Sequence, residues 1–138
     1  MEPKLFVATK AFIIYREKVL IVRESHSYAD GTNAGKFDVV GGRMHPGTRF
    51  DENLKREVKE ETGLDIAVGL PFFVNEWYPK VRGEQWQIIG MFFSCRAQGA
   101  KVLLSSDHVD YLWIQPTDYA KYPLIENLVP AFKAFIEL

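Results

Sequence analysis

The chain has 138 residues, with 17 Lys and Arg against 18 Asp and Glu, a formal net charge of −1 and 47% hydrophobic residues. This length fits one domain, which buries roughly 68% of the surface that its unfolded chain exposes. A full hydrophobic core can therefore form without disulfides or structural metal ions. The charge balance argues against broad, salt-driven binding of nucleic acid, which needs a basic face, and leaves room for a small basic pocket for a phosphorylated ligand.

The single cysteine, Cys95, excludes an intrachain disulfide and a cysteine-rich zinc site. Its apolar neighbours predict a buried, inert thiol. The first residues do not resemble a signal peptide, and no apolar run approaches the roughly 18 residues of a membrane span. We therefore expect one cytoplasmic domain over residues 1–138, with no membrane and no extended nucleic acid as partners.

The chain begins with two predicted strands. Residues 5–15 and 19–22 are rich in β-branched and aromatic side chains, and the short link over 16–18 predicts a hairpin. Residues 24–36 carry Ser, Asp, Gly, Thr and Asn and predict a loop that is long enough to be a candidate for function. A short apolar strand over 37–40 then runs into a glycine pair.

From residue 49 to residue 62 the hydrophobic period is helical, because apolar side chains recur every four positions. Thr48 is expected to cap the N-terminus of this helix, with Asp51 in a capping-box-like position. Gly63 stands where a helix ends in a left-handed residue.

The second half of the chain predicts further strands and a closing helix. The strands are expected near 66–77, 86–96 and 111–114, and the helix over 124–136. Pro130 either lies in the first turn of that helix or kinks it. Strands, a helix, more strands and a terminal helix indicate an α/β fold in which helices cover a mixed sheet.

Three acids share one side of the first helix. At 100° per residue, Glu57, Glu60 and Glu61 fall within a 100° arc that overlaps the apolar face. Glu57 faces like charges at i+3 and i+4, which a hard divalent cation such as Mg²⁺ would neutralise. The alternative is a solvated acidic face. The glycine-rich loop over 41–47 favours the cation site, because such a loop brings backbone groups close to a ligand.

Loop and helix together resemble the signature of the Nudix hydrolases, G-x5-E-x7-R-E-U-x-E-E-x-G-U, where U is bulky and apolar. Gly42 opens the pattern and residues 56–64 close it, so eight of nine specified positions match at the correct spacing. The departure is Thr48, where the family has Glu. This leaves open an altered metal stoichiometry, an altered substrate or reduced activity.

The resemblance covers nearly the whole chain and implies a Nudix α/β/α sandwich with a mixed sheet. It implies a pyrophosphohydrolase that uses Mg²⁺, or Mn²⁺ in its place, and cleaves a nucleoside diphosphate linked to another moiety, such as ADP-ribose or a nucleotide sugar. Pro79 has a spacing seen in ADP-ribose-cleaving members. The alternatives are a nucleoside triphosphate pyrophosphatase of the sanitising type and a catalytically silent, nucleotide-binding regulator. Family members are often dimers, so a homodimer is an expected partner.

The resemblance also implies roles for residues that match the family's motifs. The metal ligands would be Glu57, Glu60, Glu61 and the carbonyl of Gly41. The catalytic residues would be Glu57, Glu60, Arg56 and Asp107. One of the acids would orient or deprotonate the attacking water, with Asp110 in reserve, while Arg56 would pin the carboxylates.

The remaining expected contacts are with the substrate. Arg23 and Arg43 could meet phosphate. Trp77, Tyr78 and Trp86 are candidates for an aromatic slot that holds the base, with packing in the strands as the alternative. His45 is expected to be a loop or pocket residue rather than a ligand.

Overall fold

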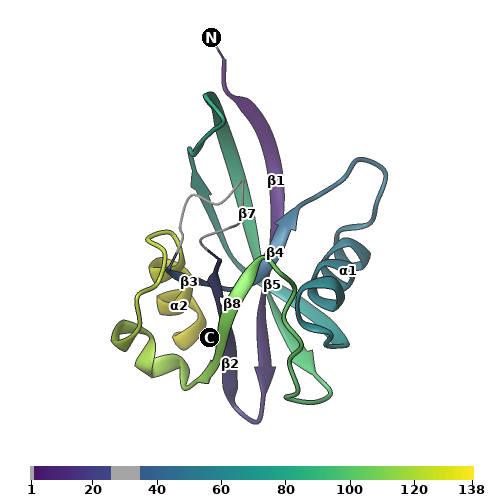
Figure 1. Ribbon diagram of the computed structural model, residues 1–138, viewed down its shortest axis with the longest axis vertical. Coiled ribbons are helices and arrows are strands. Elements are labelled where there is room, and N and C mark those ends of the chain that lie inside the picture. The colour runs from purple at the N-terminus through teal and green to yellow at the C-terminus, as the bar shows by residue number, and fades with distance from the viewer. Residues whose placement is uncertain (1, 26–34) are drawn as a thin grey trace.

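The computed structural model describes residues 2–25 and 35–138, and within them an eight-stranded mixed sheet lies between two helices (Figure 1). The strands are β1 (Lys4–Tyr15), β2 (Lys18–Glu24), β3 (Phe37–Asp38), β4 (Val40–Arg43), β5 (Ile66–Trp77), β6 (Lys80–Val81), β7 (Glu84–Ala97) and β8 (His108–Ile114). The helices are α1 (Phe50–Thr62), α2 (Leu128–Ile136) and the 3-10 helix η1 (Pro116–Lys121). The α/β class with a mixed sheet, expected from the order of the elements, is confirmed.

Strand β1 is the long central strand and changes its neighbour along one edge. It runs parallel to β7 from Lys4, opposite Trp86, to Ile14, opposite Arg96. On its other edge, β2 pairs with it only beside the hairpin turn, and β4 pairs with it from Ala8 to Ala11. The sheet therefore splits between β2 and β4, and this split opens next to the loop that leads into α1.

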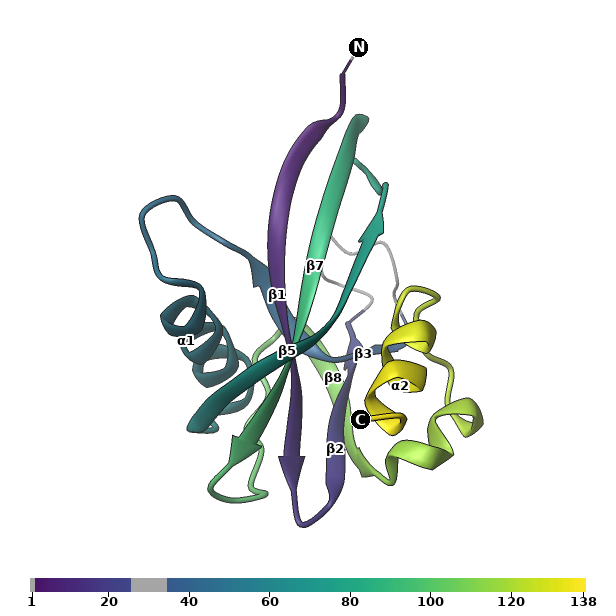
Figure 2. The same ribbon diagram turned by 180° about the vertical axis from the view of Figure 1, so that it is seen from behind.

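Each face of the sheet carries its own core. Along β1, Ile13 packs on the side of α1 with Leu54, while Phe12 packs on the side of α2 with Phe132. These side chains have no exposed surface, and the alternation follows from the period of two in a strand. Figure 2 shows the same arrangement from behind, with α1 and α2 on opposite faces.

Most predicted elements in the first half are confirmed. The predicted hairpin turns at Arg16 and Glu17, which both have positive φ, at 48° and 68°, as a type I′ turn requires. Gly63 ends α1 with a φ of 75°. Residues 26–34 of the predicted loop lie outside the described residues.

The predicted N-cap of α1 is wrong. Arg49 occupies that position in an extended conformation without a side-chain cap, so Thr48 lies before it. Asp51 does not complete a capping box, because its carboxylate binds the Arg49 guanidinium, with Nε 3.1 Å from Oδ1.

The closing helix begins four residues later than expected, at Leu128. Residues before it are held in extended backbone by β3, because Phe37 N–H donates to Pro123 O and Ile125 N–H donates to Phe37 O. Pro130 lies in the first turn of α2. The strand β6 and the helix η1 were not predicted.

Two further expectations concern Cys95 and membrane-spanning helices. Cys95 is 2% exposed, so the predicted burial is confirmed, and burial raises the pKa of its thiol to about 12. In the part of the chain that the structure describes, no helix combines the length and apolar character needed to cross a membrane.

Candidate active site

A cavity of about 270 Å³ opens at the split in the sheet, beside α1. Residues 39–42 form part of its lining. Its carboxylates come from Glu24, Asp38, Glu57, Glu61 and Asp107, and its basic side chains from Lys10, Arg43, His45 and His108. We call it the acidic cavity. It brings together Gly41, Arg43, Glu57, Glu61 and Asp107, five of the residues that the sequence singles out.

The glycine pair lets β4 pack against both of its neighbours. A Cβ atom at Gly41 would overlap the backbone oxygen of Thr9 on β1. A Cβ atom at Gly42 would lie 3.2 Å from Cδ of Glu57 and 3.3 Å from both of its carboxylate oxygens. The absence of side chains here therefore allows the Glu57 carboxylate to approach the backbone of β4.

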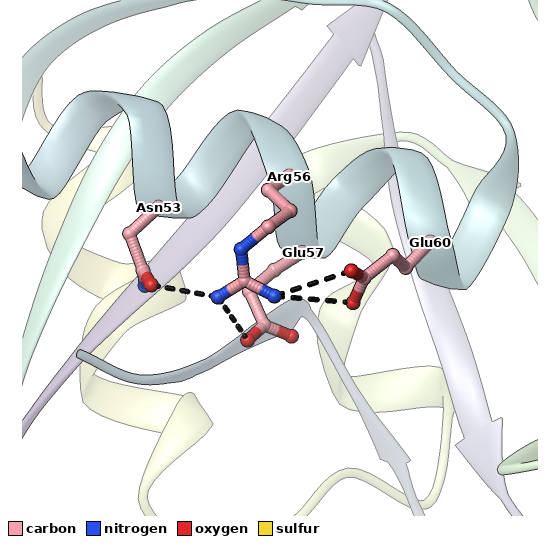
Figure 3. A network of polar contacts seen from close by, with 4 residues as sticks. All are labelled: Asn53, Arg56, Glu57 and Glu60. Carbon is pink, nitrogen blue, oxygen red and sulfur yellow. Dashed lines mark hydrogen bonds and ion pairs between the residues drawn. The ribbon is translucent and has the colours of Figure 1, made fainter. Parts of the chain in front are cut away.

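Arg56 links the acids along α1 (Figure 3). Its Nη1 donates to both carboxylate oxygens of Glu60, at 3.2 and 3.3 Å. Its Nη2 donates to Asn53 Oδ1 at 2.9 Å and to Glu57 Oε1 at 3.4 Å. Asn53, which is buried, thus helps to orient Arg56, and the pattern of charges along the helix did not indicate this contact.

The acids differ in their surroundings. The side chains of Glu57 and Glu61 are 16% and 15% exposed, against 56% for Glu60. Glu60 does not line the acidic cavity, and its carboxylate is held by Arg56. Burial raises the pKa of Glu57 against the effect of the neighbouring Arg56.

Glu61 is held by two residues, one just before β8 and one at its start. His108 Nδ1 lies 3.0 Å from Glu61 Oε2, at ion-pair distance but outside hydrogen-bond alignment, and Ser105 Oγ donates to the same oxygen at 2.6 Å. His108 and Ser105 together lower the pKa of Glu61, against the opposing effect of burial. Asp107 lies beside them, and burial, followed by the charge of Glu61, raises its pKa.

Lys10 is a residue of this cavity that the sequence analysis missed. Its side chain is 11% exposed, and its Nζ lies 2.8 Å from Asp38 Oδ2. The other oxygen of Asp38 accepts the Val39 N–H at 2.7 Å. A charge inside an otherwise apolar strand was the available signal, but only the pairing of strands reveals its partner. Ser105 and His108 were missed because nothing in the sequence relates them to α1.

Arg23 and Asp110 pair with each other, with Arg23 Nη2 3.2 Å from Asp110 Oδ2. The Arg23 guanidinium lies over the ring of Phe37, 5.4 Å from its centroid. Neither residue lines the acidic cavity or the second cavity described next.

The second cavity, of about 760 Å³, lies between the ends of β5 and β7 and the start of α2. Trp77, Tyr78, Pro79 and Trp86 line it together with Asn127, and we call it the aromatic cavity. A Cβ atom at Gly90 would overlap the ring of Trp77. The glycine therefore allows Trp77 to cover β7 closely.

The acidic cavity is lined by carboxylates, the donors that a hard divalent cation prefers. Over residues 2–25 and 35–138, however, no three His, Cys, Asp or Glu side chains are grouped so as to hold a metal ion. Glu57 and Glu61 already face the cavity, and Arg56 binds the third acid. The donor chemistry therefore fits such an ion, and a third side chain would have to move to complete the site.

Comparisons with known proteins find relatives of this chain. A family model described as the NUDIX domain matches residues 4–136. Nucleoside triphosphatase NudI of Escherichia coli K12 is 29% identical over 101 residues, which cover 68% of this chain and 72% of that protein. The Salmonella arizonae protein of the same name is 27% identical over 104 residues, with the same shares of the two chains.

Solved structures share the fold. The MutT protein from Methanosarcina mazei Go1 superimposes with a TM-score of 0.88 at 26% identity, over 99% of this chain and 96% of its own. An ADP-ribose pyrophosphatase from Streptococcus suis has a TM-score of 0.67 at 23% identity, over 94% and 90% of the two chains.

Proposed function

Because this chain belongs to the Nudix family, we propose that it is a pyrophosphohydrolase that cleaves a phosphoric anhydride bond of a nucleotide in the acidic cavity. One observation carries the proposal. The same small cavity receives Glu57 and Glu61 from α1 and Lys10 and Arg43 from the neighbouring strands. Carboxylates that suit a cation and basic side chains that suit a phosphate therefore line one cavity.

Hydrolysis of the anhydride adds one water. The water oxygen forms a bond to one phosphorus, the bridging oxygen leaves with the electrons of the broken bond, and a base takes up a proton. We propose Asp107 as the base that accepts this proton, because Glu57 and Glu61 are the acids that would hold a cation. Burial and the charge of Glu61 raise the pKa of Asp107, which makes a carboxylate a stronger base near neutral pH.

Glu57, Glu61 and the carbonyl of Gly41 would hold Mg²⁺, or Mn²⁺ in its place, and Glu60 would join them on release from Arg56. The ion, when bound, supplies neutralisation of the diphosphate charge and lowers the pKa of bound water. Basic side chains of the chain complete the site. Lys10 and Arg43 bind phosphate oxygens by charge-assisted hydrogen bonds, and Arg56 orients Glu57.

For the substrate, we propose a nucleoside triphosphate first. The relatives named nucleoside triphosphatases support this class. The second candidate is a nucleoside diphosphate linked to another moiety, such as ADP-ribose. It is favoured by Pro79, whose spacing matches ADP-ribose-cleaving members and which lines the aromatic cavity. In both cases the nucleoside would occupy the aromatic cavity, with Trp77 and Tyr78 as contacts for the base.

A panel of purified nucleotides tests the function and separates the classes. Triphosphates are assayed with Mg²⁺ and inorganic pyrophosphatase, and diphosphate conjugates with Mg²⁺ and alkaline phosphatase, with release of phosphate as the readout. Turnover of triphosphates alone supports the first candidate, and turnover of conjugates alone supports the second. Tight binding of a nucleotide without any turnover would overturn the enzyme in favour of a silent regulator.

Variants of α1 locate the chemistry. Glu57→Gln and Glu61→Gln remove acids of the cavity, and we expect kcat to fall by about a hundredfold or more. Glu52→Gln is the matched control, because Glu52 lies on the same helix, has a side chain that is 61% exposed, does not line the acidic cavity, and forms an ion pair with Lys55 at 3.9 Å. Wild-type rates in both cavity variants would refute the assignment of the site.

A further inference from the structure

Arg43, at the end of β4, lies against two aromatic rings. Its Cζ lies 4.6 Å from the ring centroid of Phe6 and 4.5 Å from that of Trp86. The centroids of the two rings are 4.7 Å apart, and the ring planes are inclined at 57°. The three side chains come from the neighbouring strands β4, β1 and β7, so the sheet itself sets their spacing.

The partners of Arg43 distinguish it from Arg23, Arg49 and Arg56. Arg23, Arg49 and Arg56 each bind a carboxylate, whereas none of the residues that the structure describes provides an acid for Arg43. A guanidinium that lies against aromatic faces keeps the N–H donors at its edge available. Arg43 is thus oriented by its surroundings, and no residue within 2–25 and 35–138 takes up its hydrogen-bonding capacity, which suits it to a ligand.

Trp86 is itself held in place. Its Nε1 donates to Glu84 Oε1 at 3.3 Å, and the other oxygen of Glu84 lies 2.7 Å from Lys4 Nζ. The indole is therefore anchored at its edge by Glu84 and covered on a face by Arg43. This arrangement suits a support for the arginine better than a surface on which a base stacks.

The contact between Arg43 and Trp86 also joins the two cavities. Arg43 lines the acidic cavity, and Trp86 lines the aromatic cavity. If the nucleoside occupies the aromatic cavity and the anhydride lies beside Glu57, the phosphate nearest the nucleoside passes Arg43.

We infer that Phe6 and Trp86 are positioning residues that hold Arg43 at this junction, where it binds the phosphate nearest the nucleoside. The inference rests on the proposed function and assigns Trp86 a role different from the base slot considered for it. Arg43 is then the residue that selects nucleotides over nucleosides, and the two rings set its geometry.

Trp86→Leu tests the inference, with Trp86→Phe as the conservative variant and Phe6→Leu as a second route to the same loss. We expect KM for the best substrate of the panel to rise about tenfold in Trp86→Leu and in Phe6→Leu, with kcat much less affected. Trp86→Phe should recover most of the loss. In an Arg43→Ala background, Trp86→Leu should add little, because residues that act through one another are not additive.

Binding of two simple probes separates positioning from base stacking. Inorganic pyrophosphate should bind Trp86→Leu more weakly than wild type, whereas the nucleoside of the best substrate should bind both equally. Weaker binding of the nucleoside with unchanged pyrophosphate affinity would show that Trp86 stacks on the base, and this would overturn the inference. Tyr15→Leu is the matched control, because Arg16 lies over Tyr15 at 5.3 Å and neither lines the acidic cavity or the aromatic cavity.

The two proposals fail in different ways. If wild type turns over no nucleotide of the panel, the proposed function is wrong, and the pyrophosphate measurement still tests the role of the rings. If wild type is active and both Trp86→Leu and Phe6→Leu retain its KM and its pyrophosphate affinity, the positioning role is wrong and the function stands. Thermal unfolding of each variant verifies that it is folded at the assay temperature.

Discussion

The carboxyl group of Glu57 lies so close to Gly42 that a Cβ atom at position 42 would be 3.2 Å from Glu57 Cδ. This approach joins strand β4 to the acids of α1 and gives a physical reason for a glycine at the start of the motif. The space beside Gly42 is part of the site, because the carboxylate occupies it.

Gly42→Ala should therefore reduce activity more than stability. The added methyl group displaces the Glu57 carboxylate by a few tenths of an ångström, and we expect kcat to fall by about tenfold or more while the free energy of unfolding falls by about 1 kcal/mol. Steady-state kinetics and urea denaturation measure the two effects. Gly99→Ala is the control, since a Cβ atom there meets nothing within 4 Å. Equal kcat in both variants would contradict the role of this contact.

Lys10 is expected to serve substrate binding, because its buried ammonium faces the acidic cavity with Asp38 as its partner. Lys10→Met should raise KM by about tenfold, as expected for a lost charge-assisted hydrogen bond to phosphate. It should also lower the free energy of unfolding by on the order of 2 kcal/mol, because it leaves the partly buried Asp38 without its ion pair.

The double variant Lys10→Met with Asp38→Asn separates these effects. It removes both charges, so stability should largely return while KM stays high. Recovery of the wild-type KM in the double variant would mean that Lys10 acts only by neutralising Asp38. Lys59→Met is the control, because Lys59 lies on the exposed side of α1 and pairs with Asp65.

Asp107 should set the acidic limb of the pH–rate profile. Its pKa is raised by burial and by the charge of Glu61, and it accepts a proton only when ionised. Activity should therefore fall as the pH drops through this raised pKa. Asp107→Asn should lower kcat by about a hundredfold and remove that limb from the residual activity. Wild-type kcat and an unchanged acidic limb would place the base elsewhere, with Glu57 as the next candidate.

The buried thiol of Cys95 should lower the stability of the protein at high pH. The unfolded thiol ionises near its ordinary pKa of 9.0, while the folded thiol keeps its proton up to about 12. The unfolded state therefore loses the proton first, and this residue lowers stability as the pH rises from about 9 toward 12. Cys95→Ala should weaken the fall of urea midpoints across that window. At pH 8 the thiol of the folded protein should resist labelling that the unfolded protein undergoes rapidly. Rapid labelling of the folded protein would contradict its burial.

Local patterns were sufficient for many elements. The helix that ends at Gly63 is evident from apolar side chains every four residues, and β5 has the bounds 66–77 that its composition predicts. The start of α2 was not predictable in this way. Leu124 continues the helical spacing of the apolar residues that follow it, but hydrogen bonds that join Pro123 and Ile125 to Phe37, far away in the sequence, hold residues 123–125 extended.

The same limit applies to the site. Glu57, Glu60 and Glu61 lie on one helix, so periodicity alone groups them, although it does not reveal that Arg56 draws Glu60 away from the cavity. Lys10 and Asp38 meet only through the pairing of β1, β2, β3 and β4. The contact of Arg43 with Trp86 likewise needs the register of three strands.

The most direct measurement of the central claim is turnover of the nucleotide panel by wild type, Glu57→Gln and Glu52→Gln, each with EDTA and with Mg²⁺ restored. We predict that wild type and Glu52→Gln hydrolyse an anhydride bond only when the ion is restored, and that Glu57→Gln remains at least about a hundredfold slower. Equal turnover by wild type and Glu57→Gln, or full activity of wild type in EDTA, would contradict a cation-dependent pyrophosphohydrolase built on the acids of α1.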